Sequence, residues 1–174
     1  MRRYHMLSEG TTAPDFALTG LDAPDDDGER QFREFELNEF ARGVPTLLAF
    51  YPGDFSPVCT DELCSLRDID LSRAGETYDV YAISRDSLFT HEAFAYEHDL
   101  EFPLLSDVEG EVCRAYDAVH ETDAGEGVEA GLAKRTLYVL GPDLAIAYAW
   151  QSDDPYVEPD LQDAVDAMDS VARA

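Results

Sequence analysis

Residues 44–68 read VPTLLAFYPGDFSPVCTDELCSLRD, and this stretch decides the fold. The run 44–51 is apolar apart from one proline and one threonine, which predicts a central strand buried on both faces. The tripeptide Pro-Gly-Asp at 52–54 is a strong turn signal, and residues 59–74 are rich in helix formers. We therefore expect a buried strand that passes through a short loop into a helix.

The remainder of the chain predicts further strands and helices in alternation. Strands are expected at 13–18 (an edge strand entered through a proline), 32–37, 78–84, 102–107, 135–140 and 144–150, the last two forming a hairpin. Helices are expected at 87–98 with Ser87 as the N-cap, in a short segment that ends at Tyr116, and at 161–171. This order predicts an α/β fold with a central mixed β-sheet flanked by helices, formed by a single domain over residues 1–174.

The charge of the chain is strongly negative. Asp and Glu total 38 against 12 basic residues, giving a formal net charge of −26, and Lys134 is the only lysine. Such a charge repels nucleic acid and anionic membranes, so neither is an expected partner. Nine Phe and nine Tyr argue against a disordered chain. We hypothesise adaptation to high intracellular salt, because salt screens the self-repulsion of an acidic surface.

The N-terminus and the cysteines indicate a cytoplasmic protein. Residues 1–6 contain two arginines with no apolar stretch behind them, so neither a secretory nor a twin-arginine signal is expected, and no apolar run is long enough to span a bilayer. Three cysteines, Cys59, Cys64 and Cys113, do not resemble a disulfide framework. They predict reactive or buried thiols in a reducing compartment.

Cys59 and Cys64 are the candidate reactive pair. Cys59 falls in the first turn of the predicted helix, where free backbone N–H groups and the helix dipole stabilise a thiolate, the nucleophilic form of cysteine. Five residues along an ideal helix separate two side chains by roughly 140° and about 7.5 Å of rise. A disulfide needs Cα atoms within roughly 7 Å and facing Cβ vectors, so the pair can bond only if the first turns of the helix unwind.

The cysteine spacing by itself leaves other interpretations open. A cysteine near a helix start is most often a small buried hydrophobe. Half of a zinc site is disfavoured because no second cysteine–histidine pair accompanies it, and a thioredoxin-type site would have two residues between the cysteines rather than four. Neither a metal nor another cofactor is expected. His91, His98 and His120 have no partner at a useful spacing, which favours exposed positions for all three.

Residues 50–68 closely resemble the active-site loop of peroxiredoxins, and the four-residue gap between the cysteines is similar to the Q-type branch, also called bacterioferritin comigratory protein. The resemblance continues in order through Ala13-Pro14-Asp15-Phe16 and the segments 83–87, 102–107 and 134–136, while the loops 22–30 and 120–131 fit poorly. It implies a thioredoxin-like fold and a thiol peroxidase that reduces hydrogen peroxide and organic hydroperoxides. It also implies recycling by a thioredoxin-like reductant, and a monomer.

The resemblance assigns roles to six residues of this chain. Cys59 would be the peroxidatic nucleophile and Cys64 the resolving cysteine that closes an intramolecular disulfide. The other four would shape and charge the pocket: Ser56 would hydrogen-bond the peroxide, Pro52 would shield the thiolate, Arg135 would stabilise thiolate and peroxide oxygens, and Glu62 would hold the arginine.

Two alternative functions remain open, and Cys113 has no role in the family's reaction. A peroxide sensor that relays oxidation to a partner protein would share the first chemical step, and a general disulfide oxidoreductase could use the same fold. The set Pro52, Ser56 and Arg135 favours a peroxide-reactive protein over the oxidoreductase. Cys113 matches no family role, and we expect it in the core of the short helix that ends at Tyr116.

Overall fold

The computed structural model describes residues 6–72 and 78–174. The start of the chain, on which the expectation about signal peptides rests, lies outside the described residues except for Met6. The expected end of the helix 59–74 also lies outside them.

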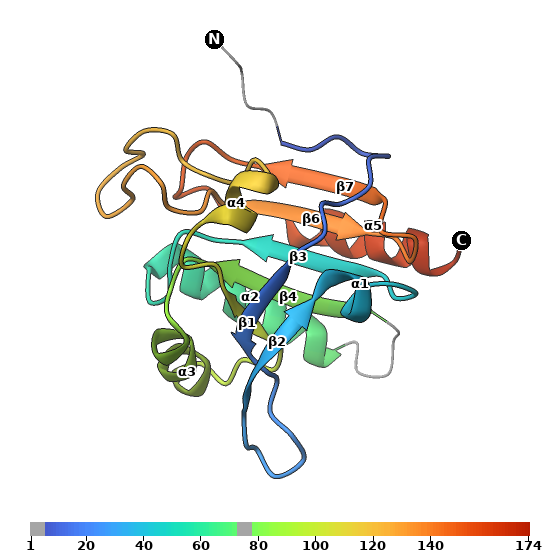
Figure 1. Cartoon of the computed structure of the whole chain (residues 1–174), viewed down its shortest axis with the longest axis horizontal. Helices are drawn as coiled ribbons and strands as arrows, with labels where there is room; N and C mark the ends of the chain where they lie inside the picture. Colours follow the sequence, from blue (N-terminus) through green and yellow to red (C-terminus); the bar gives the residue numbers. More distant parts are fainter. Residues whose placement is uncertain (1–5, 73–77) are drawn as a thin grey trace.

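A seven-stranded mixed sheet forms the centre of the protein (Figure 1). Its strands in chain order are β1 Ala17–Leu21, β2 Phe32–Glu36, β3 Thr46–Phe50, β4 Asp79–Ser84, β5 Leu104–Ser106, β6 Thr136–Leu140 and β7 Ile146–Gln151. Their spatial order is β2-β1-β5-β4-β3-β6-β7. Strand β3 pairs in parallel with β4 and antiparallel with β6, which confirms the predicted mixed sheet.

Strand β3 is buried on both faces, as its continuous apolar sequence predicts. Leu47 and Ala49 join one hydrophobic cluster, and Leu48 and Phe50 join another on the opposite face. This is the period-two alternation of a strand between two layers.

Helices cover both faces of the sheet (Figure 1). They are α1 Leu37–Phe40, α2 Pro57–Ser72, α3 Leu88–Glu97, α4 Glu111–Ala115 and α5 Leu161–Ala172. Apolar side chains of α2, α3 and α5 join the first cluster, and those of α1 and α4 join the second. The hairpin of β6 and β7 and the amphipathic helix α5 are confirmed, and the Ser87 side chain caps α3 by accepting from the backbone N–H of Thr90.

The prediction for the first strand was wrong in its bounds and in its place. Strand β1 begins at Ala17 and lies inside the sheet between β2 and β5, so β2 forms the edge. The segment around Ala13 instead hydrogen-bonds to the backbone of Leu144. Gly20 permits the internal position, because a Cβ there would lie 2.5 Å from Leu105 Cδ2 and 2.8 Å from the Leu104 carbonyl oxygen.

The short helix α1 was also not expected. Leu37, which the alternating pattern placed at the end of a strand, begins this helix and is fully buried. The strand predicted over 32–37 therefore ends one residue earlier than expected, at Glu36.

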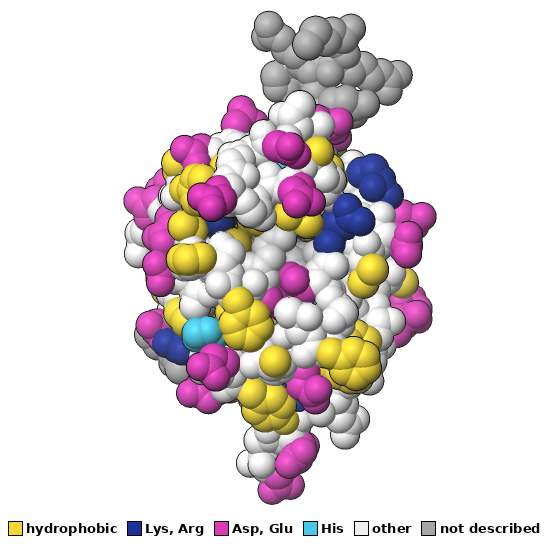
Figure 2. Space-filling model, turned by 90° about the vertical axis from the view of Figure 1, so that its left-hand side faces the viewer, with side chains coloured by type: hydrophobic (Ala, Val, Ile, Leu, Met, Phe, Trp, Pro, Cys, Tyr) yellow, Lys and Arg dark blue, Asp and Glu magenta, His cyan; other side chains and the backbone are white. Residues whose placement is uncertain are grey.

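The surface carries the acidic excess. Figure 2 shows Asp and Glu side chains spread over one whole face, with few Lys and Arg among them. Within the described part of the chain, no helix is both long enough and apolar enough to cross a membrane.

Candidate active site

The loop 52–56 leads from β3 into α2 and sets the position of Cys59. Helix α2 begins at Pro57, a favoured first helical residue because its missing N–H needs no partner there. The backbone carbonyl of Ser56 accepts hydrogen bonds from both the backbone N–H and the hydroxyl of Thr60, each at 2.8 Å. Cys59 therefore lies in the first turn, as predicted, and its side chain is completely buried.

Arg135 brings Cys59 and Glu62 together. It directly precedes β6, is fully buried, and its Nη2 donates to Cys59 Sγ at 3.3 Å. The same Nη2 donates to the backbone carbonyl of Pro155 at 2.8 Å, and Nη1 forms a buried ion pair with Glu62. Because Glu62 follows Cys59 by three residues on α2, both side chains lie on one helix face and meet the same guanidinium.

The charges of this group are set by burial and by their pairing. Burial opposes the charge on Arg135, but Glu62 and Cys59 together raise its pKa, so the guanidinium stays charged. Burial raises the pKa of Glu62 to about 7 against the lowering effect of Arg135. The raised pKa of Glu62 agrees with its hydrogen bonding, because its Oε1 atom is buried without a partner among the residues that the structure describes.

The three cysteines are free thiols in different surroundings. Cys64 is half-buried on α2, and burial raises its pKa. Cys113 is fully buried in α4, and burial together with Asp107 raises its pKa well above the usual range. The expected core position of Cys113 is confirmed, and such a thiol is inert because it does not ionise.

Pro52 and Ser56 lie at the two ends of the loop before α2. Pro52 is buried directly after Tyr51, and Ser56 is half-buried directly before Pro57. The direct contacts described above join Cys59, Glu62 and Arg135, while Cys64 lies further along the same helix.

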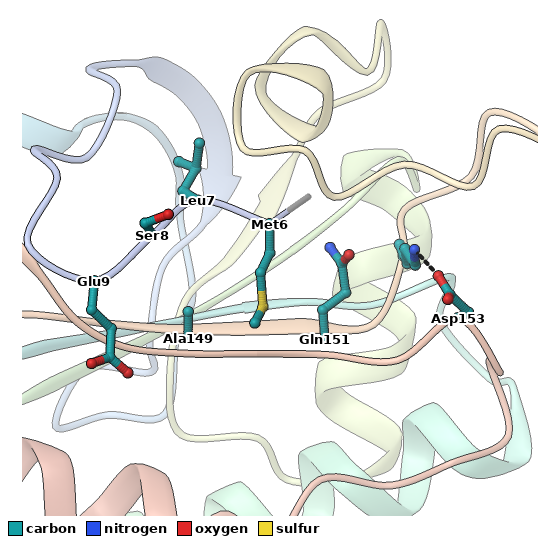
Figure 3. A pocket seen from close by; sticks show the side chains of 8 residues that line it. Met6, Leu7, Ser8, Glu9, Ala149, Gln151 and Asp153 are labelled. Atoms are coloured by element: carbon teal, nitrogen blue, oxygen red, sulfur yellow. Dashed lines mark ion pairs between the residues drawn. The ribbon is translucent and has the colours of Figure 1, made fainter. Parts of the chain in front are cut away.

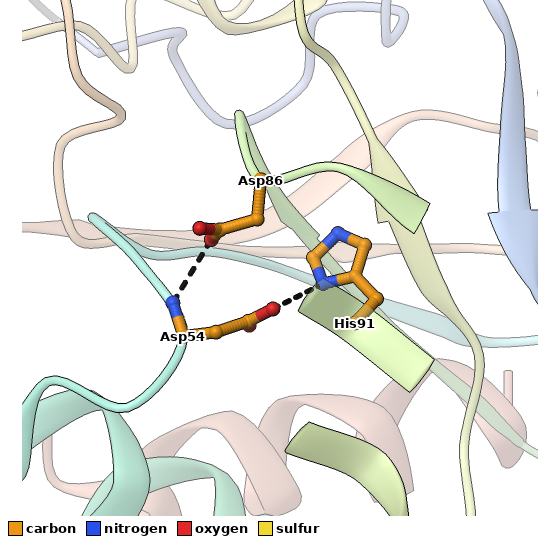
Figure 4. Close-up of side chains that lie close together, drawn as sticks. All are labelled: Asp54, Asp86 and His91. Carbon is orange, nitrogen blue, oxygen red and sulfur yellow. Dashed lines mark hydrogen bonds and ion pairs between the residues drawn. The ribbon is translucent and has the colours of Figure 1, made fainter. Parts of the chain in front are cut away.

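The prediction for His91 was wrong. His91 is fully buried, and its Nδ1 lies 2.7 Å from Asp54 Oδ2 (Figure 4). Asp54 stands in the loop 52–56, and its backbone N–H donates to Asp86 Oδ2 at 2.9 Å. A partner 37 positions away in sequence gives no spacing signal, which is why the pair was missed. The signal that existed is that His91, Phe94 and Ala95 share one buried face of α3.

The expectation of exposed positions was also wrong for the other two histidines. His120 is only 4% exposed, and burial lowers its pKa, with Lys134 adding to the effect. His98 is half-buried, and its ring packs against Phe94 at a centroid distance of 4.9 Å. The Phe94 ring, one helical turn away, contacts the His98 ring, and local polarity does not reveal such a contact.

A surface pocket is lined by the start of the described chain, by β7 and by Lys134, and Cys59 is not among its lining residues. It is lined by Met6 to Glu9, Lys134, Ala149, Gln151 and Asp153 (Figure 3). Lys134, the residue before Arg135, forms an ion pair with Asp153 there. The pocket therefore includes the sequence neighbour of the buried arginine, but it contains none of the six predicted site residues.

A buried cysteine at the start of a helix, in contact with a buried arginine directly before a central strand, is the arrangement that the sequence led us to expect of a thiol peroxidase. The family model described as the AhpC/TSA family matches residues 10–149. The chain is 34% identical over 146 residues to the putative peroxiredoxin bcp of Coxiella burnetii, covering 83% of this chain and 88% of that protein. It is 32% identical over 146 residues to the chloroplastic peroxiredoxin Q of Triticum aestivum, covering 84% and 60%.

Solved structures have the same fold. AhpC of Mycobacterium tuberculosis superimposes with a TM-score of 0.78 at 21% identity over 96% of this chain and 94% of that chain. Peroxidoxin BcpB of the same organism superimposes with a TM-score of 0.67 at 27% identity over 97% of each chain. These matches confirm the thioredoxin-like fold. The chain belongs to the AhpC/TSA family of peroxiredoxins, and its activity is that of a peroxidase.

Proposed function

We propose that the protein reduces hydrogen peroxide and organic hydroperoxides at Cys59. The Cys59 thiolate attacks one peroxide oxygen, the O–O bond breaks, and the other oxygen leaves with a proton as water or an alcohol. Cys59 becomes a sulfenic acid. The single observation that carries this proposal is the contact of 3.3 Å between Arg135 Nη2 and Cys59 Sγ. A fixed cation there stabilises the thiolate and the negative charge that passes onto the leaving oxygen.

The remaining site residues have supporting roles in this proposal. Glu62 and the Pro155 carbonyl hold the guanidinium in one orientation. Ser56 offers a hydroxyl to the peroxide from the loop end, and Pro52 shields the thiolate from water. Positioning of this kind lowers the barrier because the reacting atoms need no reorganisation.

We propose that Cys64 resolves the sulfenic acid. Its thiolate attacks the Cys59 sulfur, water leaves, and an intramolecular disulfide forms. Both cysteines are free and lie on the intact helix α2, where the helical spacing keeps their sulfurs apart. The first turns must therefore unwind in each cycle. A thioredoxin-like dithiol then returns the disulfide to two thiols by exchange.

Peroxide consumption coupled to a dithiol reductant in molar KCl tests the proposal. With a protein dithiol as the reductant, wild type and Cys113→Ser should turn over, Cys59→Ser should be inactive, and Cys64→Ser should be oxidised once and turn over further only when a small thiol is also supplied. Catalytic turnover of wild type separates a scavenger from a sensor, which would oxidise once and wait for a partner protein. Undiminished turnover of Cys59→Ser would refute the proposal.

A further inference from the structure

His91 is placed so that both of its ring nitrogens face acceptors. Nε2 lies 3.1 Å from the backbone carbonyl oxygen of Leu105, and a carbonyl oxygen only accepts. Nδ1 lies 2.7 Å from Asp54 Oδ2. A neutral imidazole carries one proton and cannot donate at both positions. The shared proton on the Nδ1 side therefore belongs either to a doubly protonated His91 or to a protonated Asp54.

Two contacts favour the proton on His91. The Tyr51 hydroxyl donates to Asp54 Oδ1 at 2.6 Å, and its oxygen also lies 3.4 Å from His91 Nδ1. The single hydroxyl proton is used on Asp54, so the second contact is attractive only if Nδ1 is the donor. Imidazole is also a much stronger base than a carboxylate.

A second carboxylate also favours the proton on His91. Asp86 Oδ2 accepts from the backbone N–H of Asp54 and from the Ser84 hydroxyl at 2.5 Å, the pattern of an ionised carboxylate. One carboxylate oxygen of Asp54, one carboxylate oxygen of Asp86 and one ring nitrogen of His91 lie within 4.8 Å of one another (Figure 4). Within the described part of the chain, the contacts of His91 with titratable groups involve Asp54, Asp86 and Tyr51, and burial raises the pKa of Tyr51 well above its usual value.

We propose that His91 is a positioning residue that remains doubly protonated and, as a buried cation beside Asp54 and Asp86, holds the loop 52–56 in its reactive shape. The inference rests on the proposed reduction of peroxide at Cys59. In this proposal the cluster fixes Asp54, which lies two residues before Ser56 and five residues before Cys59.

The loop needs such an anchor because its backbone is strained. Phe55, directly after Asp54, has a φ of 64°, a left-handed conformation that is unfavourable for a bulky residue. Asp54 is fixed on three sides, at its backbone N–H by Asp86 and at its carboxylate by Tyr51 and His91. The Phe55 ring packs against Phe94 at 5.0 Å from the other side. Loss of the charge pair would free the strained loop to relax.

The protonation state is measured by NMR of the histidine ring nitrogens in ¹⁵N-labelled protein, with the His91 signals assigned by their loss in His91→Gln. Wild type should show protons on both ring nitrogens of His91, as the contacts of these two atoms with acceptors require. In Asp54→Asn the amide can donate to Nδ1 without a change of shape, so Nδ1 should lose its proton. A wild-type His91 with an unprotonated Nδ1, or an Asp54→Asn ring that stays doubly protonated, would overturn the proposal.

The kinetic consequence is measured as the single-turnover rate of Cys59 oxidation by hydrogen peroxide. Asp54→Asn and His91→Gln should react about ten- to a hundredfold more slowly, since small displacements of reacting groups have effects of this size. Glu92→Gln removes one negative charge from the same helix outside the cluster and should react at the wild-type rate. An Asp54→Asn protein that folds, has a neutral His91 and oxidises at the wild-type rate contradicts the proposal.

The NMR and the kinetic measurements together distinguish a failure of this inference from a failure of the proposed function. If wild-type Cys59 did not react with peroxide at all, the proposed function would fail while the NMR result still fixed the charge of His91. If wild type reacted normally and its His91 were neutral, only the present inference would fail.

Discussion

Arg135 Nη2 lies 3.3 Å from Cys59 Sγ although the two residues are 76 positions apart in the sequence. Both side chains are fully buried, so the contact exists only when the start of β6 is packed against the first turn of α2. The site is therefore a product of the completed sheet. Neither the cysteine nor the arginine has a reactive environment in its own segment alone.

Replacement of Arg135 by lysine should reduce the rate of peroxide reduction by about 10²–10³-fold, the usual loss when one fixed donor to a developing charge is removed. A single ammonium cannot contact Cys59, Glu62 and the Pro155 carbonyl with the planar geometry of a guanidinium. Stopped-flow oxidation of Cys59 measures the rate. The control is Arg114→Lys at an exposed position on α4, which should be silent. Wild-type rates in Arg135→Lys would contradict the role of the contact.

Glu62 should make the stability of the protein depend on pH in a definite direction. Its pKa in the folded protein is raised to about 7, so the folded state binds this proton more tightly than the unfolded state. Its stabilising contribution is then present at low pH and is lost as the pH rises through about 7.

Chemical denaturation of wild type and Glu62→Gln across this pH range measures the effect. As the pH rises, the free energy of unfolding of wild type should fall relative to that of Glu62→Gln, by on the order of 3 kcal/mol in total. A difference that is independent of pH would show that Glu62 titrates normally in the folded protein.

The fold was predictable from local patterns, and the site only in part. The apolar run before Pro52 predicted β3, and the helix formers of 59–74 predicted α2 and hence the place of Cys59 in its first turn, although the helix begins two residues earlier, at Pro57. The bounds and the place of β1 were not predictable, because its interior position depends on pairing with β5 and not on local sequence.

The contacts of the site depend on tertiary structure that no spacing encodes. Arg135 and Glu62 were identified from family resemblance, whereas the Pro155 carbonyl is a backbone group with no sequence signal. His91 was missed because its partner Asp54 lies 37 positions away in the sequence, although His91 shares the buried face of α3 with Phe94 and Ala95.

Formation of the disulfide between Cys59 and Cys64 should unwind the start of α2. Hydrogen exchange followed by mass spectrometry should show faster exchange of amides 57–64 in the peroxide-treated protein, with α5 unchanged. The reason is that five residues of intact helix hold the two sulfurs on different faces. Peroxide-treated Cys64→Ser serves as the control and should keep the protection of the reduced protein. Equal protection in both wild-type redox states would exclude this disulfide.

The acidic surface should make stability depend on salt. The formal net charge is −26, and acidic side chains are dispersed over the face seen in Figure 2. At about 1 M salt the Debye length falls to about 3 Å, which screens their repulsion. The thermal midpoint should therefore rise between dilute buffer and molar KCl. Sucrose at matched osmolality provides the control for solvent exclusion, and an equal midpoint at low and molar KCl would count against adaptation to high salt.

Trapping the first oxidised species tests the central claim most directly. Cys64→Ser is treated with one equivalent of hydrogen peroxide in the presence of a reagent specific for sulfenic acids, and the modified residue is located by peptide mass spectrometry. The account predicts modification of Cys59, with Cys113 unmodified because its thiol is buried and does not ionise. Modification of Cys113 with Cys59 left as a free thiol would contradict the account.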